Sequence, residues 1–529
     1  MRRLPRHALL RSAVVLLALG LTSVADAKSP ARRATRQAKA DTVEDPAPPT
    51  MEERQAVFGA IDEAFKAGRK AEVADLLVEV VENPDHAVFH AEAYARLAGV
   101  LESLDLPFAA LMAHERALAT DAELASGSAK RAIALADKVG DTALLEKVFA
   151  ANVGLDVDDA TRSRMAYLAA REAHAKDNLG TAAAILKMVS KDDPYFPEAK
   201  TLEGVILARQ GKPESALAPL LTAQAAAKQA GRGDKFDNIT TLNIARSYYA
   251  AENWPRAIEF YAQLPRESRQ WVDAVFERAW AHFRLSDTNG ALALLGVHES
   301  PFFQDWYFPE ATLLRAHSLF LMCKFPAASK QIDDFVARYA PMRQTLAQVG
   351  ARTPDDVFAQ MRKHIEEGGG ELPEMVTWRF EEEDRFRDSL RAVRSAEEEL
   401  ARMQNVSANP FTEWASERVG SRKDALVRAE GARVQSRAAD MEAQLVQMLA
   451  DAEINKLDLM QMEQRLYEMS AAKGKAVEAR ETVSRKKRVK PDQRWWPWEG
   501  EYWQDEVGYY RITSKPDCPM GMQVGTGAN

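Results

Sequence analysis

Small residues recur along the middle of this 529-residue chain at intervals close to 34 positions. Two series run in parallel, and in both the steps between successive members are 34, 41, 34 and 37 residues. A fixed period of this length is typical of a chain built from repeated helix pairs, in which small side chains let the two helices approach closely. The members are Ala170, Gly204, Ala245, Ala279 and Ala316 in the first series and Ala182, Ala216, Ala257, Ala291 and Ala328 in the second.

This spacing matches the tetratricopeptide repeat, a unit of two antiparallel helices with small residues at its eighth and twentieth positions. The 41-residue step is explained by an inserted loop around residues 231–237, and Pro194 falls where a proline ends the second helix of its unit. Alanine-rich helices also match such positions by chance, but two steps of 34 residues in both series favour the repeat. The sequence therefore predicts tetratricopeptide-like helical repeats over residues 51–340, stacked into an α-solenoid whose concave face binds partner segments.

The first 27 residues have the three parts of a secretory signal peptide. Several arginines precede an apolar run from Ala13 to Val24, and Ala25-Asp26-Ala27 provides small residues for cleavage. The apolar run is well short of the roughly 20 residues that cross a bilayer as a helix. Residues 28–50 are charged and lack apolar periodicity, which is typical of a disordered leader. We therefore expect residues 1–27 to be removed and the mature chain to be exported.

The mature chain is expected in the periplasm, and an association with the outer membrane stays open. No later stretch is apolar enough to span a membrane, and no cysteine follows the apolar run to carry a lipid. The net charge of −8 argues against nucleic acid as the main partner, because phosphate binding needs a dense basic face.

Only two cysteines occur, Cys323 and Cys518. In an oxidising compartment they form either one disulfide, which would tie the C-terminal tail to the repeats, or two free thiols. Spacing along the chain does not favour the bridge, because it says nothing of the proximity that a disulfide requires.

The repeat pattern breaks after residue 340. Prolines at 341, 354 and 373 and three glycines at 368–370 predict a linker over residues 341–373. A charged helical stretch follows over residues 374–490, with a pause at Asn409-Pro410, and we expect it to form coiled-coil helices.

The second part of this stretch has a heptad pattern. One series runs every seventh residue from Val427 to Ala476 and the other from Gly431 to Lys473, and only Asn455 and Lys473 are neither apolar nor small. Alanine and methionine occupy many positions of these two series, which form the seam of the coiled coil. A weak or antiparallel pairing is therefore as plausible as a stable parallel dimer. We favour an intrachain hairpin of residues 375–403 on 420–480, with dimerisation of two chains as the alternative.

The sequence contains no pattern that nominates a catalytic, cofactor or metal site. His86 and His90 are four residues apart and share one face of a helix, but no third ligand is near in the sequence, so ordinary packing or surface histidines are favoured over a metal site. His282 and His317 fall inside repeat helices, where packing is favoured over catalysis. We therefore expect no enzymatic activity, no cofactor and no metal.

The C-terminal tail, residues 491–529, is unusually aromatic. So many amphipathic aromatic side chains are expected to pack against other protein surface or a ligand rather than to stay in water. Two alternatives stay open: the tail docks on its own helical body, which is favoured, or it anchors a partner protein or a glycan. The aromatic residues are Trp495, Trp496, Trp498, Tyr502, Trp503, Tyr509 and Tyr510.

Residues 271–339 (WVDAVFERAW to DFVARY) and the tail segment WPWEGEYWQDEVGYYRI resemble the exported tetratricopeptide-repeat proteins of myxobacteria and related bacteria. Some of those proteins belong to the gliding-motility machinery of the cell envelope. The resemblance implies a periplasmic or outer-membrane-associated assembly protein. A second periplasmic family, the cell-division coordinators that act with peptidoglycan synthases, also combines a coiled coil with such repeats, but there the coil precedes the repeats.

The sequence and the resemblance together predict a non-enzymatic periplasmic scaffold that binds envelope proteins through its repeats. The gliding-motility machinery is the specific assembly that the resemblance suggests. The alternative is a regulator of enzymes that synthesise or hydrolyse peptidoglycan.

Overall fold

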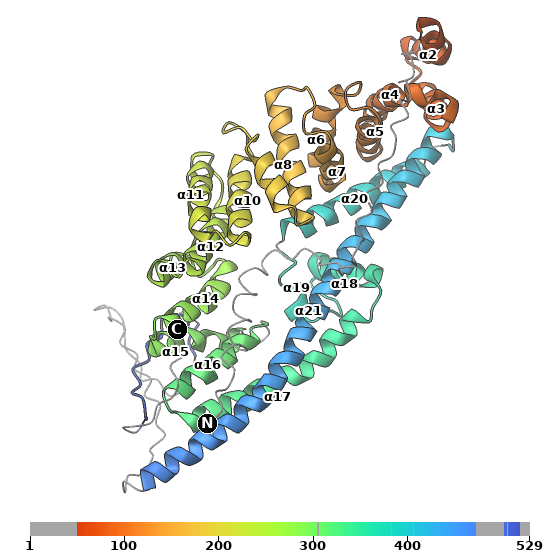
Figure 1. The fold of residues 1–529 in the computed structure, drawn as a ribbon. Coiled ribbons are helices and arrows are strands. Elements are labelled where there is room, and N and C mark those ends of the chain that lie inside the picture. Colours follow the sequence, from red (N-terminus) through yellow and green to blue (C-terminus); the bar gives the residue numbers. More distant parts are fainter. Residues whose placement is uncertain are drawn as a thin grey trace, which may run out of the picture. The chain divides into compact units, whose positions relative to one another are not determined.

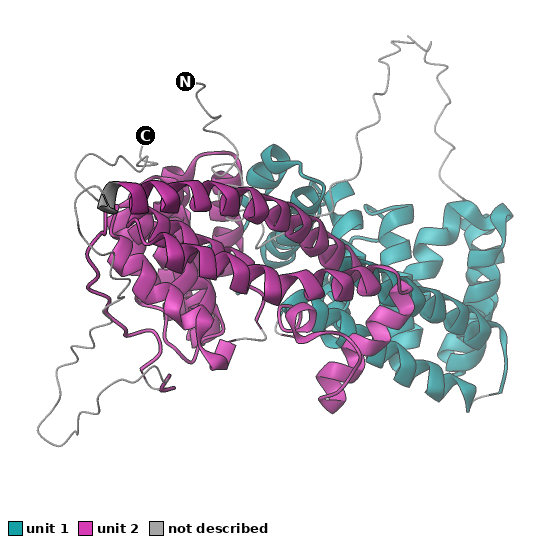
Figure 2. Ribbon diagram, turned by 90° about the horizontal axis from the view of Figure 1, so that it is seen from below, with its two compact units in different colours: residues 1–196, 382–433 teal, residues 197–381, 434–529 magenta. Residues whose placement is uncertain are grey.

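A computed structural model describes residues 50–303, 306–381, 383–405, 407–471, 502–504 and 506–518 of the chain (Figure 1). These residues form helices joined by turns, without a β-strand among them, so the predicted all-α fold is confirmed. The chain divides into two compact units, each built from two stretches of sequence (Figure 2). Unit 1 comprises residues 1–196 and 382–433, and unit 2 comprises residues 197–381 and 434–529.

Unit 1 consists of a series of helices and a later helical hairpin. The hairpin is formed by α20 and by the long helix α21 up to Arg433. The helices are α2 (Met51–Lys66), α3 (Lys70–Glu82), η2 (Pro84–Phe89), α4 (His90–Ser103), α5 (Pro107–Thr120), α6 (Gly127–Val139), α7 (Ala143–Ala151), α8 (Asp159–Ala175), α9 (Leu179–Leu186), α20 (Asp384–Gln404) and α21 (Pro410–Ala471).

Unit 2 consists of four helix pairs, three further helices (η3, α18 and α19) and the later part of α21. Helices of a pair contact each other, and so do successive pairs. The helices are α10 (Phe196–Arg209), α11 (Pro213–Gln229), α12 (Asp234–Ala250), α13 (Trp254–Tyr261), α14 (Gln270–Arg284), α15 (Thr288–Glu299), η3 (Pro301–Phe303), α16 (Pro309–Leu321), α17 (Phe325–Gly350), α18 (Pro354–Glu367) and α19 (Glu374–Thr377).

The turn inside each repeat pair has the same backbone conformation. One residue in the left-handed region ends the first helix, and the N–H of the next residue donates to the carbonyl five positions earlier, as Lys212 does to Leu207 at 2.9 Å. This is the Schellman arrangement that ends many helices. The left-handed residues are Asp177, Gly211, Glu252, Ser286 and Cys323, and their positions repeat the steps of 34, 41, 34 and 37 residues.

The small residues of the two sequence series lie inside the helix pairs. All nine alanines are buried, with at most 4% of any of them exposed. At Gly204, an added Cβ would lie 2.5 Å from Cγ of Leu220 on the partner helix α11. The first and second helices of this pair therefore approach too closely for any side chain at this position.

The expected linker over residues 341–373 is mostly helical. Helix α17 continues through Pro341 to Gly350, because burial of Leu346 and Val349 compensates for the hydrogen bond that a proline removes from a helix. Pro354 begins α18 rather than breaking it, since a proline is well accommodated in the first helical turn. Two short segments lack helical structure, residues 351–353 between α17 and α18 and residues 368–373 between α18 and α19.

The predicted intrachain hairpin is present, but it is shorter than expected. In unit 1, Glu383 just before α20 lies 2.6 Å from Arg433 on α21, and Arg385 lies 3.2 Å from Glu430. Beyond Arg433, α21 belongs to unit 2, where the Tyr307 hydroxyl donates to the Met441 carbonyl at 3.1 Å.

In unit 2, heptad positions of α21 are buried within the chain itself. The buried residues are Val434, Ala438, Met441, Leu445, Ala452, Leu459 and Leu466. Residues of the same unit contact this part of α21, among them Tyr307 at Met441, Arg343 at Glu442 and Asp333 at Lys456.

Buried polar contacts tie the hairpin to the repeats of unit 1. The Glu399 carboxylate accepts from the N–H groups of Phe108 and Ala109, both at 2.8 Å, and so satisfies donors in the first turn of α5. Burial raises the pKa of Glu399, and the two N–H donors oppose that rise. Arg422 on α21 donates two hydrogen bonds of 2.7 Å to the buried Asp141 carboxylate.

Replacement of Glu399 by alanine is expected to destabilise unit 1. The change leaves two buried N–H donors without an acceptor, which costs about 2–4 kcal/mol in total. Urea denaturation of the full chain, followed by circular dichroism, measures the loss. The exposed neighbour Glu398→Ala is the matched control on the same helix and should change stability little. Equal midpoints for the two variants would contradict the capping role of Glu399.

Candidate partner-binding surface

The described part of the tail, residues 502–504 and 506–518, packs on unit 2, and we call it the strap. Val507 is fully buried in a cluster with Trp271, Leu294 and Trp378. Further along, Ser514 and Asn289 exchange two hydrogen bonds, with the Ser514 N–H donating at 3.0 Å and the Asn289 amide donating back at 3.1 Å. Residues 502–518 therefore dock on their own chain.

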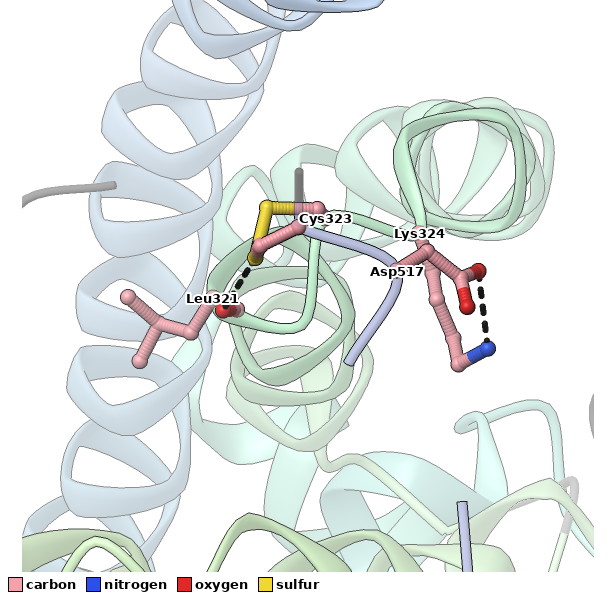
Figure 3. The surroundings of a disulfide bond; sticks show 5 residues. Leu321, Cys323, Lys324 and Asp517 are labelled. Atoms are coloured by element: carbon pink, nitrogen blue, oxygen red, sulfur yellow. Dashed lines mark hydrogen bonds and ion pairs between the residues drawn. A yellow bond between two sulfur atoms is a disulfide. The ribbon is translucent and has the colours of Figure 1, made fainter. Parts of the chain in front are cut away.

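A disulfide fixes the end of the strap. Cys323, at the turn between α16 and α17, is bonded to Cys518 with an S–S distance of 2.03 Å (Figure 3). Beside it, the Asp517 N–H donates to the Met322 carbonyl at 2.9 Å and the Lys324 ammonium lies 3.0 Å from the Asp517 carboxylate. The repeated turn of the last pair thus carries the cysteine that holds the strap.

The aromatic residues of the tail divide into three groups. Tyr502 and Tyr510 are half-buried and pack against the cluster that contains Val507. Trp503 and Tyr509 are 50% and 66% exposed. Trp495, Trp496 and Trp498 lie outside the described residues. The strongest burial in the strap belongs to Val507, a residue that sequence reasoning did not single out.

A second set of aromatic residues lies on the first helices of three successive pairs. The residues one and four places after the small residue are Arg246 and Tyr249 on α12, Trp280 and Phe283 on α14, and His317 and Phe320 on α16. Helix α14 contacts both α12 and α16, so these positions follow one another across unit 2. We call Trp280, Phe283, His317 and Phe320 the aromatic ladder.

Ring contacts connect the ladder. The Trp280 and Phe283 centroids are 5.7 Å apart, those of Phe283 and His317 are 5.5 Å apart, and those of His317 and Phe320 are 6.1 Å apart. All four side chains are half-buried. Burial lowers the pKa of His317, so its ring is neutral at pH 7 and packs as an aromatic. The sequence expectation that His317 packs is met by this geometry.

An ion pair holds the beginning of the same face. Arg246 donates to Glu277 from Nε at 3.0 Å and from Nη2 at 2.6 Å, which is a two-pronged contact between α12 and α14. Burial lowers the pKa of Arg246, but the Glu277 carboxylate outweighs burial and the pKa is raised. This charge pair is satisfied inside the chain, and it holds α12 against α14 beside the ladder.

A pocket of about 290 Å³ opens between the strap and the repeats. Trp271, Phe303 and Trp306 form aromatic walls, and Gln504 of the strap contributes polar lining. The Arg266 guanidinium lies 5.4 Å from the Trp271 ring centroid, which is within cation–π range.

Glu310 is a half-buried residue near the start of α16, and its Oε1 atom is buried. Its Oε1 atom has no hydrogen-bond partner within the described part of the chain. Burial raises its pKa to about 8, so the group is largely protonated at pH 7.

Histidines singled out in the sequence make separate contacts with other groups. His90 contacts the Asn83 carbonyl oxygen at 2.9 Å, and His282 contacts the Asp287 carboxylate at 2.8 Å. No group of three or more His, Cys, Asp or Glu side chains placed to hold a metal ion occurs among residues 50–471 and 502–518 as far as these are described. Within the same residues, no helix is long and apolar enough to cross a membrane.

No protein-family description matches the sequence, and no curated protein matches it. Similar solved structures include the Naa15/Naa10 complex bound to HypK-THB, at 11% identity, 80% coverage of this chain and a TM-score of 0.32. This chain covers 64% of that chain, which is less than two thirds of its length. The Rap protein complexed with competence and sporulation factor is 13% identical, with coverage of 74% and 99% and a TM-score of 0.28.

A solved TPR domain is also similar, at 13% identity, with coverage of 69% and 97% and a TM-score of 0.18. These identities and TM-scores are low. The repeat architecture therefore rests on the helix pairs, the repeated turns and the buried small residues of this chain.

Replacement of Gly508 by alanine is expected to lift the strap from the repeats. An added Cβ would lie 2.5 Å from Cζ2 of Trp271, and the φ of 97° is unfavourable for any residue with a side chain. Hydrogen–deuterium exchange of the strap should become faster while the disulfide still holds its end. Gly369→Ala, where no atom lies within 4 Å of the added Cβ, is the control. Unchanged exchange in Gly508→Ala would contradict the docked strap.

Replacement of Glu310 by glutamine is expected to stabilise unit 2 more at pH 8.5 than at pH 5. In the unfolded chain the carboxyl ionises near its ordinary pKa of 4.5, whereas in the folded chain the proton is held to about pH 8. Stability is therefore lost as pH rises from 4.5 to 8, and glutamine, which does not titrate, avoids this loss. Melting temperatures at both pH values measure the difference, with the exposed Glu214→Gln as control. A pH-independent effect would exclude titration of Glu310.

Proposed function

We propose that this chain is a non-enzymatic scaffold that binds a partner protein on the aromatic ladder of unit 2. The observation that carries the proposal is the recurrence of aromatic side chains at the same two positions of successive first helices, including Phe283 and Phe320. Aromatic residues dominate the binding energy of protein interfaces. A row of them at fixed spacing suits a partner segment that presents apolar side chains at intervals.

The ladder is held in place before any partner binds. Ring contacts fix neighbouring side chains, and the Arg246–Glu277 pair holds α12 against α14. A preorganised surface loses little side-chain entropy on binding, so more of the contact energy appears as affinity. Because the arginine and the carboxylate already satisfy each other, apolar contact dominates recognition here.

We propose the periplasm as the compartment. The bond between Cys323 and Cys518 supports this location, since structural disulfides persist in oxidising compartments and are rare in the cytosol. The secretory pattern in residues 1–27 agrees with export.

The specific assembly is proposed from the resemblance to exported myxobacterial repeat proteins. Within the cell envelope, the gliding-motility machinery is the first candidate, and an association with the outer membrane belongs to the same proposal. Regulation of peptidoglycan enzymes is the alternative, and the identity of the partner distinguishes the two.

The double variant Phe283→Ala/Phe320→Ala is expected to lose the partner. Both side chains are half-buried, but Phe283 also packs against the buried cluster of unit 2 and Phe320 contacts Phe325, so the melting temperature is measured to show that the double variant is folded. Proteins are crosslinked in the intact cell. The periplasmic fraction is then used for affinity capture and mass spectrometry. Leu124→Ala, at an exposed position of unit 1, is the control and should retain the partner.

Capture of the same proteins by the double variant and the parent would contradict the role of the ladder. Absence of the chain from the osmotic-shock fraction would contradict the periplasmic location. Recovery of motility proteins supports the first candidate assembly, whereas recovery of cell-wall synthases or hydrolases supports the alternative. Clearing of a peptidoglycan zymogram by the pure protein would contradict the non-enzymatic proposal.

A further inference from the structure

We infer that the end of α21 is a second docking surface, which takes a basic amphipathic helix of a partner protein. Five large apolar side chains on this part of the helix are between 43% and 63% exposed. They are Val446, Ile454, Leu457, Met460 and Tyr467, and we call them the outer stripe. This surface is separate from the aromatic ladder, and the inference does not depend on the function proposed above.

The outer stripe occupies one side of the helix. Ile454, Leu457 and Met460 follow one another at intervals of three residues, and Tyr467 comes seven residues later. Residues at these intervals share one helix face. From Val446 to Tyr467 the stripe is about 32 Å long, at roughly 1.5 Å per residue. It is long enough for a helix of about six turns to pack along it.

The opposite side of the same helix is packed inside unit 2. Leu445, Ala452, Leu459 and Leu466 are at most 4% exposed. With 3.6 residues per turn, the outer stripe is centred roughly 130° away from this buried face. Lys456 is paired with Asp333 of α17, which lies along α21 in Figure 1. Because the buried face fixes how the helix is rotated, the outer stripe is held away from the core.

The charges around the stripe determine the chemistry of its partner. From residue 442 to residue 468 the helix has six carboxylates and two cations; Lys456 is paired with Asp333, Glu442 lies 3.8 Å from Arg343, and carboxylates remain in excess. A second copy of this chain would bring the same carboxylates together, and like charges across an interface are costly. A helix with Lys or Arg beside its apolar face is complementary. The carboxylates are Glu442, Asp451, Glu453, Asp458, Glu463 and Glu468.

Helix-in-groove recognition gives the partner a recognisable sequence. Its apolar residues should recur at i, i+3 or i+4, and i+7, so that they interleave with the outer stripe. Lys or Arg should occupy the flanking positions, where they reach the carboxylates of α21. The apolar contacts provide most of the affinity, and the charges select a basic helix over an acidic one.

The test uses the full chain and a fluorescein-labelled synthetic helix of 21 residues, with leucines on one face and lysines beside them. A matched peptide has glutamates in place of the lysines. Fluorescence anisotropy is measured with the parent chain, with Ile454→Ser/Leu457→Ser/Met460→Ser, and with Val88→Ser/Leu124→Ser as control. The control removes exposed apolar side chains from unit 1 without changing the charge of either unit.

The parent and the control should bind the lysine peptide at least 10-fold more tightly than the triple variant does. The glutamate peptide should bind the parent at least 10-fold more weakly than the lysine peptide does. All substituted side chains are exposed, so melting temperatures should match the parent. Equal binding by the triple variant and the parent would overturn the inference.

Two further outcomes would assign the stripe to another occupant and overturn the inference. A parent dimer in light scattering that becomes a monomer in the triple variant would identify a second copy of this chain. The parent could fail to bind the peptide, while a variant with the five basic residues among 485–490 changed to glutamine binds it. That result would identify this segment of the same chain as the occupant of the stripe.

Discussion

The close approach of two paired helices is the constraint on which the repeat architecture depends. At Gly204 there is no room for a Cβ atom beside Leu220, and the corresponding alanines of the other pairs are buried. Helices that approach this closely must be joined by a tight turn, and each turn here places one residue in the left-handed region. The turn between α16 and α17 has a cysteine at this place, so the strap is attached at a position that the repeat itself defines.

The sequence predicted much of the fold because these constraints are local. Small residues at fixed spacing identify the pairs, and the heptad pattern of α21 identifies residues that are buried, including Leu445 and Leu459. The segment predicted as a linker is mostly helical because a proline has different effects at different places in a helix. Pro354 lies in a first turn, where its missing N–H costs nothing, and the tertiary burial of Leu346 carries α17 through Pro341.

The candidate surface was predicted only in part. Aromatic composition drew attention to the tail, whereas the deepest contact of the strap is made by Val507, next to a glycine that allows the chain to approach Trp271. Pairing of Cys323 with Cys518 could not be derived from their spacing, because 195 residues separate them and only the fold brings them together. The aromatic ladder had a signal in the sequence, since its members follow the small residue of each first helix by one and four places.

The two surfaces of unit 2 differ in the interactions by which they would recognise a partner. Beside the ladder, Arg246 and Glu277 satisfy each other, so apolar shape is proposed to dominate recognition. On α21, the apolar stripe is bordered by an excess of carboxylates, so charge adds discrimination between partners. Helix α17 follows the turn that holds the strap and also pairs with α21 through Asp333 and Lys456. One helix therefore links the position of the strap's disulfide with the position of the outer stripe.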